Sequence, residues 1–273
     1  ELLEAATRET FKKLTKASLP APRKLGDVLG PAVRGRHIQV WSPTAREQAL
    51  FERVHADGAI AIAEGSDGFT IAEQNLGNNK IDAYLQRSTP YDGTVDAATG
   101  KLTANLQIVL DNKIPDIPFP PYVVSNSRAA PQGTNVTTLA IYSPHRLVSA
   151  MVDGQEVTLG EDTELGLNVY ETGVIRVPPR GQVTLELELE GAVDLRRGYH
   201  LEIIPQPMVN AEQVSTTLRA TKGKIQGADA DGLLTRNVTL EETLPCDGGV
   251  GGGTATGGTG QGGLSVGGFG GSG

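Results

Sequence analysis

Two segments of the chain alternate strictly between apolar and polar residues, and this alternation limits the fold more than any other feature of the sequence. The apolar positions of the two segments are Leu102, Ala104, Leu106, Ile108 and Leu110, and then Val183, Leu185, Leu187 and Leu189. Successive side chains of a β-strand point to opposite faces, so the pattern predicts two strands with one face on a core and the other in water.

Weaker signals of the same kind predict many more short strands. We expect them near residues 84–96, 136–142, 147–152, 155–159, 165–170, 173–177, 199–204, 213–221 and 235–241. Turn signals separate the strands at Thr99-Gly100, Asp153-Gly154 and Pro178–Gly181. Many short strands at this spacing favour an antiparallel, immunoglobulin-like β-sandwich, which we place at residues 73–247.

The first quarter of the chain has a helical period instead. Apolar residues recur at helical spacing over about residues 1–17, a short helical turn is expected over 25–33, and a helix over 43–56. Ser42 followed by Pro43 is typical of a helix start. His37–Trp41 has the composition of a short buried strand. We therefore interpret residues 1–72 as a small α/β remnant, the end of an upstream domain, which makes the whole chain α+β.

Residues 248–273 are mostly Gly with Thr and Ser and carry no charged side chain. A segment so poor in apolar groups cannot offset the entropy lost on ordering, so we predict a disordered Gly-rich tail.

The charge balance argues against several partners. The chain has 24 basic and 32 acidic side chains and a net charge of -8. No basic run offsets this charge, so we predict no nucleic-acid partner and no membrane contact by the chain itself. Cys246 is the single cysteine, which excludes an internal disulfide and a cysteine-based zinc site.

No apolar run approaches the length of about 20 residues that a membrane helix needs, and no signal peptide is visible. The sequence starts at Glu1 within a predicted helix, so we expect a fragment whose anchor or export signal lies upstream of Glu1.

Four segments together resemble a known family. They are Arg36–Ser42, Asn75–Arg87, Pro131–Asn135 and Ile141–Pro144. Over about residues 1–245, the chain is similar to the C-terminal portion of domain of unknown function 4012 (DUF4012), a family of actinobacterial envelope proteins. The resemblance implies a membrane-anchored protein with a large extracytoplasmic region, at the cell envelope or cell surface.

What this resemblance implies about function is a non-catalytic envelope module, structural or binding, with a cell-envelope polysaccharide or another envelope protein as partner. The alternative is part of a phosphotransferase similar to the LytR-CpsA-Psr polymer ligases, acting on envelope polysaccharide. An enzyme of that type needs clustered arginines and carboxylates around a pyrophosphate and a divalent ion. Here only Arg34/Arg36 and Arg196/Arg197 are paired, so we assign no catalytic residue to this chain.

The histidines offer no metal site or catalytic relay. His37, His55, His145 and His200 are scattered singly, without the spacing that metal ligands or a local Ser/His pair would show. We interpret each as a core or surface residue, and we predict no metal and no cofactor.

The polar loop from Asn75 to Arg87 is the candidate site. In the functional interpretation, five side chains line a sugar- or phosphate-binding groove: Asn75, Asn78, Lys80, Asp82 and Arg87. In the structural interpretation, they satisfy backbone groups and form a Lys80/Asp82/Arg87 charge network that docks the sandwich on the α/β remnant. We favour the structural interpretation, because Asn and Gly at this density usually serve turns.

Overall fold

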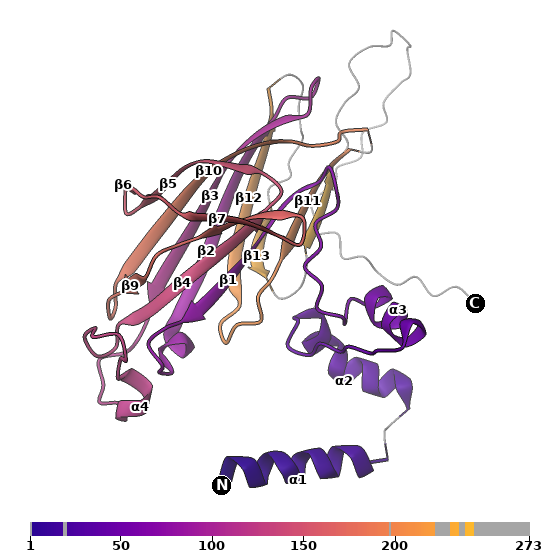
Figure 1. The fold of residues 1–273 in the computed structure, drawn as a ribbon, viewed down its shortest axis with the longest axis vertical. Helices are drawn as coiled ribbons and strands as arrows, with labels where there is room; N and C mark the ends of the chain where they lie inside the picture. The colour runs from indigo at the N-terminus through magenta and orange to yellow at the C-terminus, as the bar shows by residue number, and fades with distance from the viewer. Residues whose placement is uncertain (1, 19–20, 197, 222–229, 235–237, 243–273) are drawn as a thin grey trace. The chain divides into compact units, whose positions relative to one another are not determined.

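A computed structural model describes residues 2–18, 21–196, 198–221, 230–234 and 238–242 (Figure 1). The chain divides into two compact units, residues 1–58 and residues 59–273. The predicted Gly-rich tail at 248–273 and Cys246 lie outside the described residues.

The first unit consists of helices and loops over its described residues. The helices are α1 (Leu2–Lys16), α2 (Pro22–Arg34) and α3 (Ala45–Arg53). The helix predicted over 43–56 begins two residues later than expected: Thr44, not Ser42, occupies the N-cap position of α3, and its N–H donates to the Ser42 hydroxyl. Ser42 also donates to the Glu47 carboxylate at 2.6 Å, which fixes the entry of the chain into the helix.

The strand predicted at His37–Trp41 was wrong. These residues form a loop, Val40 donates a single backbone hydrogen bond to Ala56, and Trp41 is 74% exposed. A strand needs a partner strand for its backbone groups, and the described part of this unit contains none. The described part of this unit therefore consists of helices and loops and is not a small α/β remnant.

The second unit contains two seven-stranded sheets. Sheet A has the order β14-β11-β1-β4-β8-β7, with β9 also paired to β4. Its strands are β1 (Asp67–Asn75), β4 (Asn135–Ser143), β7 (Gly160–Glu164), β8 (Leu167–Glu171), β9 (Ile175–Val177), β11 (Tyr199–Ile204) and β14 (Val238–Glu242).

Sheet B has the order β13-β12-β2-β3-β10-β5-β6. Its strands are β2 (Leu85–Val95), β3 (Lys101–Asn112), β5 (Arg146–Val152), β6 (Gln155–Glu156), β10 (Gln182–Ala192), β12 (Glu212–Ala220) and β13 (Ala230–Leu234). The two strictly alternating segments are β3 and β10, which pair antiparallel at the centre of this sheet.

Both sheets are mixed, so the prediction of an antiparallel sandwich was wrong for two pairs. β11 runs parallel to β1, and β12 runs parallel to β2. Parallel neighbours cannot be joined by a hairpin; each of these pairs joins segments more than 100 residues apart, so no turn signal fixes their direction. The strand orders do not confirm an immunoglobulin-like topology.

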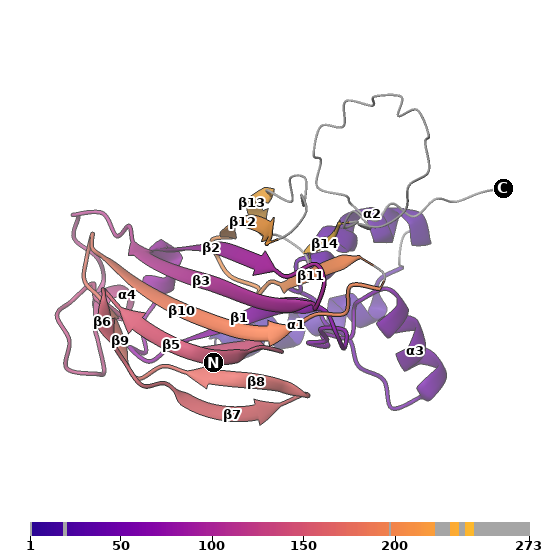
Figure 2. The same ribbon diagram turned by 90° about the horizontal axis from the view of Figure 1, so that it is seen from above.

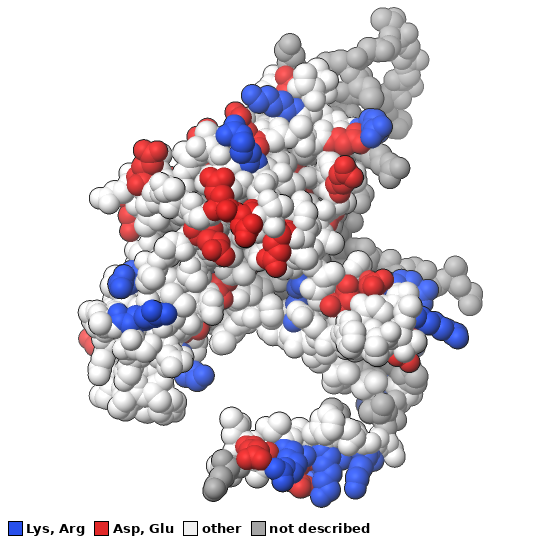
Figure 3. All heavy atoms as spheres, viewed as in Figure 1, with Lys and Arg blue, Asp and Glu red and all other residues white. Residues whose placement is uncertain are grey.

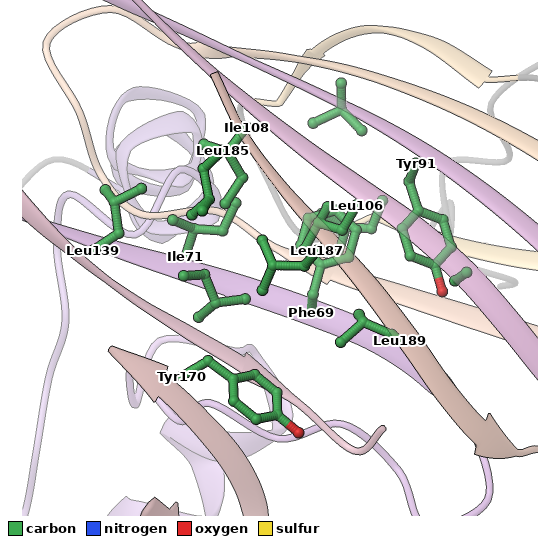
Figure 4. Packing of buried hydrophobic residues seen from close by; sticks show 14 of the residues in the cluster. Phe69, Ile71, Tyr91, Leu106, Ile108, Leu139, Tyr170, Leu185, Leu187 and Leu189 are labelled. Carbon is green, nitrogen blue, oxygen red and sulfur yellow. The ribbon is translucent and has the colours of Figure 1, made fainter. Parts of the chain in front are cut away.

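The two sheets are stacked on each other (Figure 2), and the main hydrophobic core lies between them (Figure 4). Phe69, Ile71 and Leu139 enter it from sheet A, and Leu106 and Leu187 enter it from sheet B. All five are at most 2% exposed. The burial of such side chains is the main favourable term in folding. Because the two sheets share this core, the second unit is sandwich-like.

Strand β7 is an edge of sheet A and is exposed along its whole length. Acidic side chains gather on the face where β7 runs (Figure 3), and β7 itself contributes Glu161, Asp162 and Glu164. Charges on an edge strand oppose pairing with a strand of another molecule. Glu164 also accepts a hydrogen bond from the Tyr142 hydroxyl, which raises the pKa of Tyr142 to about 12.

Candidate functional site

Of the five side chains of the predicted site, the structure brings Asn75 and Asp82 into contact and places Arg87 in a different cluster. Asn75 ends β1, Asn78 and Lys80 lie in the turn after it, Asp82 lies in the short helix η1 (Ile81–Tyr84), and Arg87 lies on β2. Asn78 adopts a φ of 60°, which suits Asn, and both Asn78 and Lys80 are exposed. Asn75 and Asp82 are only partly exposed, and Arg87 is buried.

Asn75 and Asp82 belong to an amide cluster centred on the Asp82 carboxylate. The side-chain amides of Asn75 and Asn135 both donate to Asp82 Oδ1 at 2.7 Å. The side-chain oxygen of Asn75 accepts the Gly77 N–H, and the side-chain amide of Asn79 donates to the backbone carbonyl of Ser125 at 2.9 Å. Burial raises the pKa of Asp82, while the two amide donors lower it. The cluster thus fastens the loop to β4 and to the segment after α4 (Pro121–Val124).

We expect Asp82→Ala to lower the free energy of unfolding by about 2 kcal/mol, because two partly buried amides lose their acceptor. Lys80→Ala is the matched control: its side chain is exposed and forms no ion pair with another described residue, so we expect a change within about 0.5 kcal/mol. Urea denaturation of both variants measures the difference. Equal stability of the two would contradict the structural role of Asp82.

Arg87 belongs to a separate buried charge cluster, not to a network with Lys80 and Asp82. Its Nη2 lies 2.9 Å from Glu212 Oε2 on β12, and its Nη1 lies 3.7 Å from Glu73 Oε2 on β1. The side chains of Arg87, Glu73 and Glu212 are 0%, 5% and 4% exposed. Glu212 also accepts a hydrogen bond from the Thr89 hydroxyl. Glu73 belongs to sheet A and the other two to sheet B, so the cluster links the sheets.

A second buried polar group, the Asp67 cluster, joins the sheets near the start of β1. The Tyr91 hydroxyl donates to Asp67 at 2.6 Å, and Tyr199 also donates to this carboxylate. His145 Nε2 lies 2.7 Å from Asp67 Oδ1. Asp67 is fully buried and His145 is 2% exposed. Burial, and then the negative charge of Asp67, raise the pKa values of both tyrosines, so the two phenols remain hydrogen-bond donors.

The surroundings hold His145 in one orientation. Its backbone carbonyl accepts a hydrogen bond from Tyr170 at 2.7 Å. Gly191 packs against the imidazole so closely that a Cβ at this position would overlap Nδ1. An Asp–His pair is a common part of catalytic relays, but here both side chains are closed off from solvent and from any substrate.

A shallow hollow lies on sheet B. It has a volume of about 300 Å³, and Asp92, Asn105, Glu188 and Ser149 line it. These residues form one row across β2, β3, β10 and β5, because each is directly opposite the next in the sheet register. The Asn105 side chain is exposed, while Asp92 pairs with Arg219 and Glu188 accepts from Ser149.

The two arginine pairs belong to different units of the chain, Arg34 and Arg36 to residues 1–58 and Arg196 and Arg197 to residues 59–273. Arg36 donates to the Gly58 carbonyl at 2.6 Å, and Arg196 donates through both Nε and Nη2 to the Asp194 carboxylate. Arg34 is exposed, and Arg197 lies outside the described residues.

No group of three or more His, Cys, Asp or Glu side chains that could hold a metal ion occurs in the described residues. None of the helices in the described part of the chain is long and apolar enough to cross a bilayer.

The sequence prediction missed the members of the Asp67 cluster. Tyr91, His145 and Tyr199 are 24, 78 and 132 residues from Asp67 along the chain. No local spacing relates such positions, and His145 was interpreted only as a core or surface residue.

Comparisons with known proteins leave the family open. No protein-family model and no curated protein matches the chain. Among solved structures, a putative nutrient binding protein from Legionella pneumophila is similar at 7% identity and a TM-score of 0.35, covering 55% of this chain and 53% of that one. Yeast LTA4 hydrolase in complex with bestatin is similar at 8% identity and a TM-score of 0.30, over 54% of this chain and 24% of the hydrolase.

An M1 zinc metallopeptidase from Deinococcus radiodurans is similar at 13% identity and a TM-score of 0.26, over 62% of this chain and 40% of the peptidase. In all three comparisons the chain covers less than two thirds of the other protein. Likenesses this distant carry neither a family nor an activity to the chain.

Proposed function

We propose that the chain is a non-catalytic module of an extracytoplasmic, membrane-anchored cell-envelope protein of the DUF4012 type. It would act as a scaffold that also binds an envelope polysaccharide. Classification of its sandwich as immunoglobulin-like is part of the same proposal.

The observation that carries this proposal is that the polar groups inside the second unit are buried and paired with one another. The Asp67–His145 pair, which could serve catalysis if it were exposed, is 0% and 2% exposed and is hydrogen-bonded to tyrosines from both sheets. Arg87, Glu73 and Glu212 are likewise buried and paired with one another. Groups held in this way support a rigid sandwich rather than a reacting substrate.

The hollow on sheet B supports the binding part of the proposal. Its row of Asp92, Asn105, Glu188 and Ser149 offers carboxylate acceptors next to an exposed amide. Neighbouring hydroxyls of a sugar can donate to the carboxylates and accept from the amide. The acidic side chains favour an uncharged or amino sugar over a phosphate-bearing one.

A binding titration with isolated envelope polysaccharide tests this proposal. We expect Asn105→Ala to weaken binding about fivefold, the value of one hydrogen bond of about 1 kcal/mol, without changing the melting temperature. The control is Gln86→Ala, on the same sheet but not in the lining of the hollow, which should bind like the wild type.

An activity assay tests the alternative directly. The chain is incubated with a polyprenyl-pyrophosphate-linked glycan and Mg²⁺, and we expect no transfer product. Turnover that survives repurification and disappears in Arg34→Ala or Arg36→Ala would support the phosphotransferase and overturn the proposal.

A further inference from the structure

The buried charge cluster does not balance. Arg87 supplies one positive charge, whereas Glu73 and Glu212 can supply two negative charges, and all three side chains are at most 5% exposed. A buried charge without a partner is costly, and a protein commonly avoids the cost by keeping one group neutral. Geometry selects Glu73 as the neutral one: Glu212 has the closer contact to Arg87 and also accepts from Thr89, while Glu73 Oε2 has no hydrogen-bond partner in the described chain.

The connection between β11 and β12, residues 205–211, closes over this cluster. Its Gln206 side chain accepts the Glu73 N–H at 2.8 Å and donates to the Glu73 carbonyl at 2.9 Å. β11 ends at Ile204 and does not extend alongside Glu73. The side-chain amide of Gln206 makes the two hydrogen bonds to Glu73 that the backbone of a neighbouring strand would make. Arg87 Nη1 lies 3.3 Å from Gln206 Oε1, which ties the same side chain to the charge cluster. Asn210 anchors the far end on the Leu85 carbonyl at 2.8 Å.

We propose that Glu73 is a proton-operated latch: while its buried carboxyl is protonated the 205–211 connection stays closed over the cluster, and when the proton is lost the connection opens, so that water reaches the carboxylate. The proton passes between the Glu73 carboxyl and solvent, and no other reactant is needed. The moving part is the connection through which the chain passes from sheet A to sheet B.

Burial favours the protonated form of the Glu73 carboxyl. Besides the neutral partners Thr137 on β4 and Gln206, the titratable or charged groups that face it are Arg87 on β2, Glu212 on β12 and Asp82 on η1. Burial is the largest cause, and the pKa of Glu73 is raised to about 7 although Arg87, the next largest cause, lowers it; the carboxylates of Asp82 and Glu212 raise the pKa, and a hydrogen bond with Thr137 lowers it.

Closure of the connection is favoured at low pH. The folded-state pKa of Glu73, about 7, lies above its ordinary value of 4.5. Between these two values the closed state binds more protons than the open state, so closure is favoured at low pH and is lost as pH rises toward and through 7. Above that pH both states are deprotonated and the dependence levels off.

Amide hydrogen exchange of residues 203–212, corrected for the intrinsic pH dependence of exchange, tests the latch between pH 5 and pH 8.5. We expect the opening equilibrium constant of the wild type to rise on the order of 10- to 100-fold over this range, since one pKa unit corresponds to a factor of ten. In Glu73→Gln, which resembles the protonated side chain and cannot ionise, we expect protection at pH 8.5 to match that of the wild type at pH 5.

The exposed Glu161→Gln on β7 is the matched control and should keep the wild-type pH dependence. A direct titration of the Glu73 carboxyl by carbon NMR in the wild type reports the proton itself, and it keeps the test decisive if a variant folds poorly. A Glu73 that titrates below pH 5, or exchange at 203–212 that has the same pH dependence in the wild type and in Glu73→Gln, would overturn the proposal.

Discussion

Asp67→Ala is expected to lower the free energy of unfolding by about 3–5 kcal/mol, one of the two largest effects of a single substitution in this protein. The carboxylate accepts hydrogen bonds from Tyr91 and Tyr199 and pairs with His145, all of them at most 2% exposed. Its removal leaves three buried polar groups without their partner, at about 1–3 kcal/mol for each, reduced where water enters the space. Urea denaturation with linear extrapolation measures the loss.

Two milder variants separate the causes of this loss. Asp67→Asn retains the shape and one acceptor oxygen, so we expect a smaller effect than for alanine. Tyr91→Phe removes one hydroxyl from the cluster and should cost about 1 kcal/mol. A loss below about 1 kcal/mol for Asp67→Ala would mean that the cluster does not hold the sandwich together.

Arg87→Met is expected to cost about 3–5 kcal/mol, because a buried ion pair that loses one partner leaves an uncompensated charge. The charge left behind is that of Glu212, which lies 2.9 Å from the guanidinium. Arg87→Lys should recover little, since an ammonium cannot reproduce the contacts that the guanidinium makes with Glu212, Gln206 and Ile71.

The triple variant Arg87→Met/Glu73→Gln/Glu212→Gln provides the comparison for Arg87→Met. It contains no ionisable group in the cluster, so we expect it to be more stable than Arg87→Met alone despite two further substitutions. The contrary result would be a triple variant whose loss of stability equals the sum of the losses of its three single substitutions. The cost of Arg87→Met would then not come from an unpaired carboxylate. Urea unfolding of both variants under the same conditions measures the difference.

The sequence allowed most of the sheets to be predicted because their inward faces repeat every second residue. β3 and β10 show this period without interruption, and the turns at Gly100 and Gly154 have the positive φ that their sequences indicate. β1 was missed because its first five residues are all buried, which removes the alternation. The parallel pairings of β11 with β1 and of β12 with β2 could not be predicted, because the paired strands lie far apart in the sequence.

The candidate site was predictable to the extent that it is local. The density of Asn and Gly after β1 indicated a tight polar loop, and Asn75 and Asp82 do meet there. Arg87 pairs instead with Glu73 and Glu212, and Glu212 is 125 residues away along the chain. A contact of this kind depends on the parallel pairing of β2 with β12, so it follows from the fold rather than from any motif.

Buried polar groups fasten sheet A to sheet B. A double-mutant cycle between Asp67→Ala on β1 and Tyr91→Phe on β2 tests it most directly, because these residues form a hydrogen bond between the two sheets. We predict a coupling energy of about 1–3 kcal/mol in urea unfolding, with the double variant less destabilised than the sum of the single variants. Additive losses, with a coupling energy near zero, would contradict the claim.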